Sequence, residues 1–116
     1  MGEVSERFSV AVRHAAGSTT VEVGGDIDLA VAGDLRQRLD AVIEASSGPV
    51  EVDLSMVTFL DSSGVVVLLG AAQRIGERDR QLTLRSPSRS AQRVLEVSGV
   101  LDAFSMQPRV LTSIDD

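Results

Sequence analysis

Hydrophobic and polar residues alternate in four short stretches of the chain, which is the pattern of β-strands with one buried face. In the clearest case, Val50, Val52 and Leu54 alternate with Glu51 and Asp53. The four predicted strands are residues 8–13, 19–24, 50–54 and 81–85, and a short edge strand is expected at 104–106. A short glycine-containing loop separates the first two strands, which predicts a β-hairpin.

Other segments have the spacing of helices. Apolar residues recur at three- and four-residue intervals in residues 31–45, which predicts an amphipathic helix. They are Leu35, Leu39, Val42 and Ile43. Residues 63–77 are rich in β-branched side chains and would fit a buried strand, but their length and the capping residues before them favour a helix. A third helix is expected to begin at Ser86–Ser88 and to stop at Gly99.

The order strand, strand, helix, strand, helix, strand, helix indicates an α/β domain. We expect a mixed β-sheet of four to five strands with helices packed on it. The domain should span residues 7–116, preceded by a flexible terminus at 1–6. Gly48 is expected to follow the cap of the first helix, and the charged turn 77–80 is expected to be solvated. A further helical turn is expected at 110–113.

The most informative stretch follows the third predicted strand. After a short connection at 55–60, the residues Asp61-Ser62-Ser63-Gly64 open the second helix. Asp and Ser cap helix N-termini because a side-chain oxygen accepts a hydrogen bond from an otherwise unpaired N–H. A hydroxyl there lies on a loop tip that another protein can reach, and the positive end of the helix dipole tolerates a phosphate. On these four residues alone, simple capping by Asp61 or Ser62 is the alternative.

Composition narrows the possible functions. The net charge of −6 argues against a nucleic-acid surface and against an anionic membrane, both of which require clustered cations. The chain has no Cys and no Lys, and its sole histidine, His14, lies at the hairpin end. No metal site or cofactor is therefore expected, and His14 is expected to have a plain surface role. The N-terminus shows no signal peptide or membrane span, so a cytoplasmic protein is expected.

The residues Asp61-Ser62-Ser63-Gly64, together with the preceding 52–55 and 57–60, resemble the signature of STAS domains. Within that superfamily the chain is most similar to bacterial anti-sigma factor antagonists. The resemblance implies that Ser62 is phosphorylated by a partner kinase of the histidine-kinase-like ATPase type, which is also the anti-sigma factor. It also implies a serine phosphatase that resets the switch.

A second element of the resemblance is Gly25-Asp26-Ile27-Asp28, whose final Asp lies near the phosphorylation loop in the family. From the residues alone, Asp28 is a helix cap. The family often has Thr at the position of Val31, and Leu or Ile followed by Gly at the positions of Val65 and Val66. These departures affect the identity of the partner more than the assignment of Ser62.

The first turns of the second helix are apolar on every side, more than one buried stripe requires. Either the chain's own loops cover this end, or some of its residues face a partner. The predicted partner-binding residues are Asp28, Asp61, Ser62, Ser63, Gly64, Val65, Val66 and Leu69.

The leading hypothesis is an anti-sigma factor antagonist. The unphosphorylated form would bind the anti-sigma factor and release a sigma factor, and phosphate on Ser62, which the helix end could accept locally, would block binding. The alternative is a non-switching STAS scaffold or a soluble subunit of a signalling or lipid-transport complex. An enzyme with a serine nucleophile is disfavoured, because it needs a nearby base. The sole histidine lies at the hairpin end, and the chain has no Cys or Lys.

Overall fold

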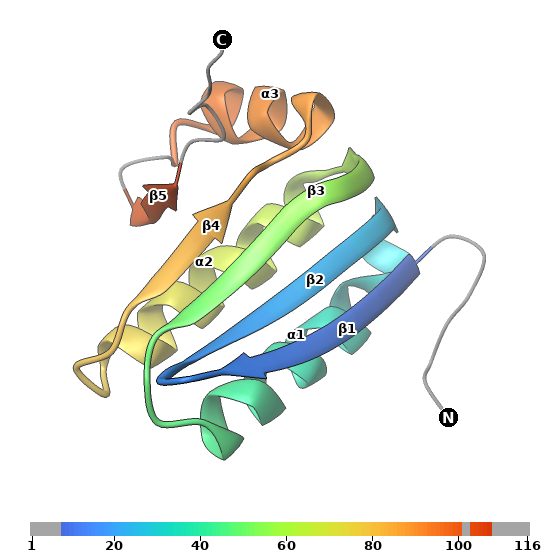
Figure 1. Ribbon diagram of the computed structural model, residues 1–116. Helices are drawn as coiled ribbons and strands as arrows, with labels where there is room; N and C mark the ends of the chain where they lie inside the picture. Colours follow the sequence, from blue (N-terminus) through green and yellow to red (C-terminus); the bar gives the residue numbers. More distant parts are fainter. Residues whose placement is uncertain (1–7, 101–102, 108–116) are drawn as a thin grey trace, which may run out of the picture.

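The predicted hairpin forms one edge of a five-stranded sheet with the order β1-β2-β3-β4-β5 (Figure 1). The computed structural model describes residues 8–100 and 103–107. β1 pairs antiparallel with β2, and the other neighbouring pairs are parallel, so the expected mixed sheet is confirmed. The strands are β1 (Phe8–Ala15), β2 (Ser18–Ile27), β3 (Val50–Leu60), β4 (Leu82–Arg85) and β5 (Ser105–Gln107).

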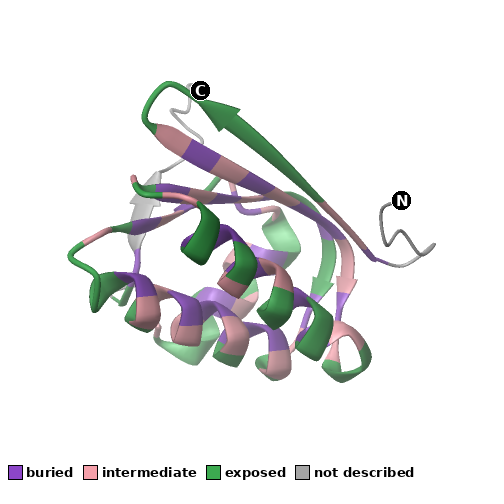
Figure 2. Ribbon diagram, turned by 90° about the horizontal axis from the view of Figure 1, so that it is seen from below, coloured by how far each residue is buried: buried purple, intermediate pink, exposed green. Residues whose placement is uncertain are grey.

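Each pair of parallel strands is connected through a helix, as a parallel pair requires. The helices are α1 (Leu29–Ala45), α2 (Ser62–Gly76) and α3 (Arg89–Ser98). α1 and α2 lie side by side against one face of the sheet (Figures 1 and 2). Residues 1–6 and the expected turn at 110–113 lie outside the described residues.

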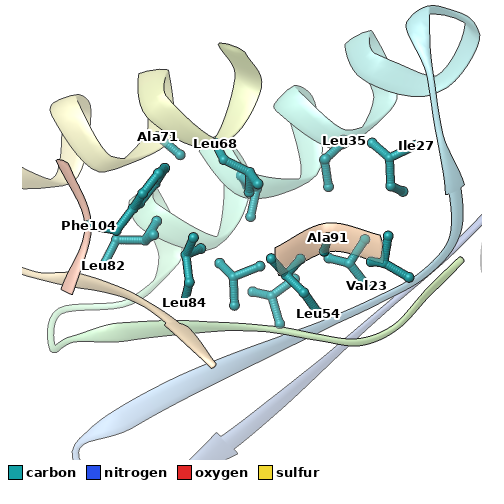
Figure 3. Close-up of a cluster of buried hydrophobic side chains, with 14 of the residues drawn as sticks. Val23, Ile27, Leu35, Leu54, Leu68, Ala71, Leu82, Leu84, Ala91 and Phe104 are labelled. Atoms are coloured by element: carbon teal, nitrogen blue, oxygen red, sulfur yellow. The ribbon is translucent and has the colours of Figure 1, made fainter. Parts of the chain in front are cut away.

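The core lies between this face of the sheet and the helices, and its side chains are almost all aliphatic (Figure 3). Leu35 of α1 and Leu68 of α2 point down toward Val23, Leu54 and Leu84 on the strands. All five side chains are buried. Burial of a side chain of this size stabilises the fold by about 1.5–3 kcal/mol, so this layer holds α1 and α2 against the sheet.

β3 differs most from the sequence prediction. Residues 55–60 were expected to form a connection, but β3 continues to Leu60 and pairs there with the end of β2. Two register shifts interrupt this pairing, between Glu22 and Gly24 and between Gly25 and Asp26. A bulge breaks the strict alternation of a strand, so the pattern disappears from the sequence while the strand persists.

The end of α1 also differs from the prediction. The helix ends at Ala45 and is capped by Ser46, whose backbone is extended, so Gly48 does not take the position after the cap. A side chain at Gly48 would collide with the carbonyl oxygen of Gly17 in the hairpin turn. Glycine is needed at position 48 because two backbone segments approach each other closely there.

Arg80 lies in the charged turn that was expected to be solvated, but it is half-buried against the end of α1. Its guanidinium donates to the carbonyl of Ile43 at 2.8 Å, to the carbonyl of Gly48 at 2.9 Å and to the hydroxyl of Ser46 at 2.7 Å. The contact with Ile43 satisfies a carbonyl that the last turn of α1 leaves without an intrahelical partner, and the other two hold the segment that follows the helix. The turn after α2 therefore fixes the end of α1.

We expect Arg80→Ala to lower the free energy of unfolding by about 1–2 kcal/mol, because it leaves these partly buried acceptors without a donor. Arg80→Lys should recover only part of the loss, since one ammonium cannot match the planar guanidinium. The control is Arg78→Ala, which removes an exposed ion pair with Glu44 and should cost about 0–1 kcal/mol. Urea unfolding measures all three, and equal losses in the two alanine variants would contradict this role of Arg80.

Candidate functional site

Two helices begin side by side at the carboxyl edge of the sheet (Figure 1). β2 and β3 are paired as far as Ile27 and Leu60, and the next residue of each strand is an aspartate. Asp28 is the N-cap of α1 and Asp61 is the N-cap of α2. The N–H of Asp61 donates to the carbonyl of Ile27 at 3.1 Å, so the two helix starts are joined directly.

Asp26 and Thr58, which lie just before these strand ends, strengthen the same junction. The Thr58 hydroxyl donates to the Asp26 carboxylate at 2.6 Å across the two strands. Asp28 accepts from the N–H of Ala30 at 3.0 Å, as the capping interpretation predicted. Because parallel strands lie about 4.8 Å apart, Asp28 and Asp61 are placed at neighbouring strand ends. The site is therefore acidic before any modification.

Ser62 is the first residue of α2, and it is exposed. Within residues 8–100 and 103–107, its hydroxyl has no hydrogen-bond partner. The cap is made by Asp61 instead, whose carboxylate accepts from the N–H of Ser63 at 2.8 Å and from that of Gly64 at 3.4 Å. Ser62 is thus presented to solvent at a fixed position without contributing to the cap.

The same capping contacts change one expectation about phosphate. The helix end was expected to accept a phosphate locally, but the N–H groups of Ser63 and Gly64 already donate to Asp61. A phosphate on Ser62 would have to compete with that carboxylate for the same donors, and the two anions repel each other. Charge placed on Ser62 should therefore project outward.

Two of the predicted partner-binding residues are buried. Gly64 packs under the helix start, and Val65 is only 4% exposed within the core. A Cβ at Gly64 would lie 2.5 Å from Leu60 Cδ1 and 2.8 Å from Ile27 Cγ2, so α2 rests directly on the strand ends. These two residues are structural and are removed from the predicted surface.

The remaining predicted residues divide by exposure. Ser63 is half-buried, and Leu69 is partly buried against the core. Val66 is 65% exposed, one helical turn after Ser62. The apolar surplus of α2 is therefore explained mainly by burial, with Val66 left at the surface.

Sequence reasoning missed two exposed apolar residues at this edge. Leu29, the first residue of α1, is 77% exposed, and Phe59, near the end of β3, is 49% exposed. We call these two residues and Val66 the apolar rim, because each lies within four residues of the first residue of α1 or α2. Leu29 could have been found, because it falls off the helical stripe of Leu35 and the residues that follow. Phe59 could not, because the irregular end of β3 has no readable alternation.

The arrangement offers little for catalysis. His14 lies at the hairpin end, where its ring contacts the Thr19 hydroxyl at 3.3 Å, and that is the opposite end of β2 from Ser62. Among the described residues, no group of three or more His, Asp or Glu side chains could hold a metal ion. In the same part of the chain, no helix is both long enough and apolar enough to cross a membrane. What the site presents is a hydroxyl, two carboxylates and an apolar rim.

Several known proteins are similar to this chain over most of its length. The family model described as "Mlab, STAS domain" matches residues 10–108. The anti-sigma-B factor antagonist of Staphylococcus epidermidis is 26% identical over 82 residues, which cover 71% of this chain and 76% of that protein. The antagonist of Staphylococcus aureus gives the same values.

Solved structures match over more of the chain. An anti-sigma factor antagonist from Mycobacterium paratuberculosis superposes with a TM-score of 0.80 at 26% identity, covering 90% of this chain and 89% of that one. The Bacillus cell fate determinant SpoIIAA, in its phosphorylated form, superposes with a TM-score of 0.66 at 18% identity, covering 85% and 91%. At that identity, the second match supports the fold alone.

Proposed function

Because the chain belongs to the STAS domain family, we propose that it is an anti-sigma factor antagonist switched by phosphorylation of Ser62. The unphosphorylated protein binds an anti-sigma factor and so releases a sigma factor. The relatives named as anti-sigma factor antagonists, at 26% identity over most of the chain, support this class of partner. The proposal makes the protein a binding module and not an enzyme.

One observation gives the main support for a phosphorylation switch at Ser62. Ser62 is exposed and its hydroxyl is without a partner among the described residues, whereas the capping of α2 is complete without it. In the alternative of a non-switching scaffold, Ser62 serves only as a helix cap. Asp61 already fills that role with two hydrogen bonds, which favours the switch.

Phosphate acts through charge and size. A phosphoserine carries about −1.5 to −2 charges at neutral pH. At position 62 it stands next to Asp61, with Asp28 at the neighbouring strand end, in a chain whose net charge is already −6. A partner surface that packs on the apolar rim and fits a neutral hydroxyl would meet a large, hydrated dianion instead. Affinity then falls while the fold persists, because the core does not include the Ser62 side chain.

The proposed partners follow from this cycle. The anti-sigma factor is a serine kinase of the histidine-kinase-like ATPase type, and it contacts Asp28, Asp61, Ser62, Ser63 and Val66 together with Leu29 and Phe59 of the rim. A serine phosphatase restores the binding-competent form. This protein, the anti-sigma factor and the phosphatase all act in the cytoplasm, where the sigma factor acts.

The test is phosphotransfer. Incubation of the purified protein with the anti-sigma factor of its source organism and ATP should add one phosphate, located on Ser62 by peptide mass spectrometry. Ser62→Ala should abolish the modification and remain folded, because no described residue bonds to that hydroxyl. Ser63→Ala is the control for the position of the phosphate: it keeps Ser62 and should still accept one phosphate, located on Ser62. Phosphate on another residue, or none, would count against the proposal.

A further inference from the structure

A second feature of the surface lies between α1 and α2, next to the apolar rim. It is a hollow of about 170 Å³, which we call the arginine notch. Its lining residues are Arg36 of α1 and Val66, Val67, Gly70 and Arg74 of α2. Val66 belongs both to the notch and to the apolar rim, so the two surfaces are continuous. With a rise of about 1.5 Å per residue, the notch begins about 6 Å along α2 from Ser62.

The notch is a cationic spot on an acidic protein. Arg36 and Arg74 share the carboxylate of Asp40, with N–O distances of 3.7 Å and 2.7 Å. Two guanidinium groups and one carboxylate leave one net positive charge there, whereas the whole chain carries −6. Acidic groups of another protein are repelled by most of this chain and attracted to this spot.

The hydrogen-bonding capacity of the notch is not used up. A guanidinium has five N–H donors, and Asp40 takes the Nε donor of Arg74. The Nη2 atom of Arg74 is buried and has no hydrogen-bond partner among the described residues. A buried donor without an acceptor is costly, so an incoming acceptor toward which the guanidinium turns is favoured.

Gly70 keeps the notch open. A Cβ at this position would lie 3.0 Å from Nη1 of Arg74, so the absence of a side chain lets the guanidinium lie across the helix. Glycine in the middle of a helix is unfavourable compared with alanine. Here it provides the space that a small planar group needs beside the two arginines.

We propose that the arginine notch receives an acidic side chain, Asp or Glu, of the anti-sigma factor, as a second contact of the interface around Ser62. This inference rests on the proposed function. A carboxylate matches the planar donors of Arg36 and Arg74, and Val66 and Val67, which line the same hollow, offer apolar contact to the CH2 groups of its side chain. Continuity with the rim places the notch inside the footprint of a single protein interface of ordinary size. The contact in the notch sets the position of the partner on this surface. Phosphorylation of Ser62 controls whether the partner remains bound.

The first test is the affinity of the full chain for the purified anti-sigma factor at two salt concentrations, measured by titration calorimetry. Arg36→Gln should weaken binding about tenfold and flatten its salt dependence. The ion pair of Arg36 with Asp40 is a surface pair, so the fold should be unaffected. Arg38→Gln is the matched control: it removes the same charge from the same helix, about 200° around the axis, and should bind as the wild type does.

A second variant separates binding from folding. Gly70→Ala narrows the notch but improves helix propensity, so it should weaken binding without lowering the unfolding temperature. If both Arg36→Gln and Gly70→Ala kept wild-type affinity and salt dependence, the proposal that the notch binds an acidic side chain of the partner would be wrong. Ser62→Asp distinguishes the two claims. If it weakens binding while the notch variants do not, only the notch is wrong. If wild type does not bind the anti-sigma factor at all, the proposed function fails and the notch with it.

Discussion

Replacing Ser62 by aspartate is expected to weaken binding of the anti-sigma factor about 10- to 100-fold, or about 1.4–2.8 kcal/mol. The new carboxylate stands beside Asp61, which caps the same helix, and at the neighbouring strand end to Asp28. A partner surface packed on the apolar rim must then bury or approach a third negative charge. Because the site is exposed, the loss should be larger at low ionic strength.

The matched control is Ser62→Asn, which has nearly the same size as aspartate but no charge. It should bind within a few-fold of wild type. Both variants should stay folded, because Ser62 is outside the core and an acidic residue in the first turn of a helix is favourable. Equal weakening by Asp and Asn would show that bulk at position 62, and not charge, controls the interface.

Gly64→Ala is expected to lower the free energy of unfolding by about 1–3 kcal/mol. The added methyl group would lie 2.5 Å from Leu60 and 2.8 Å from Ile27, both of them buried at the strand ends. α2 must move away from the sheet to relieve these contacts, which also shifts Ser62. Denaturant unfolding measures the loss, and binding of the anti-sigma factor should weaken in parallel.

Gly33→Ala is the control for this substitution. Gly33 is an exposed glycine of α1, and a Cβ there meets nothing within 4 Å. Alanine is the better helix former, so this variant should be stabilised by about 0.5–1 kcal/mol. If the two glycine substitutions had the same effect, the close contact beneath Gly64 would not be what holds α2 in place.

The order of the elements could be predicted because it is written in local patterns. The spacing of Leu35 and Leu39 predicts α1, and the alternation around Val52 predicts the middle of β3. Asp61 identifies the start of α2, because capping depends on residues that are neighbours in the chain. The fold class and the position of Ser62 at a helix start therefore followed from the sequence.

The parts that could not be predicted depend on contacts between distant segments. The irregular end of β3 is held by its pairing with β2, more than 30 positions away in the chain. Gly64 and Val65 read as surface residues until the strand ends beneath them are placed. The carbonyl acceptors of Arg80 at Ile43 and Gly48 are separated from it by 37 and 32 residues. Backbone acceptors carry no residue-type signal, so no sequence pattern reveals such a contact.

Phosphate on Ser62 is proposed to control binding of an anti-sigma factor. The most direct measurement is a calorimetric titration of one purified anti-sigma factor with two forms of this protein, unmodified and stoichiometrically phosphorylated on Ser62. We expect the unmodified form to bind at least about tenfold more tightly, because the phosphate adds charge and bulk at an exposed and already acidic helix start. Equal affinity of the two forms would contradict this proposal and would leave Ser62 as an exposed residue without a switching role.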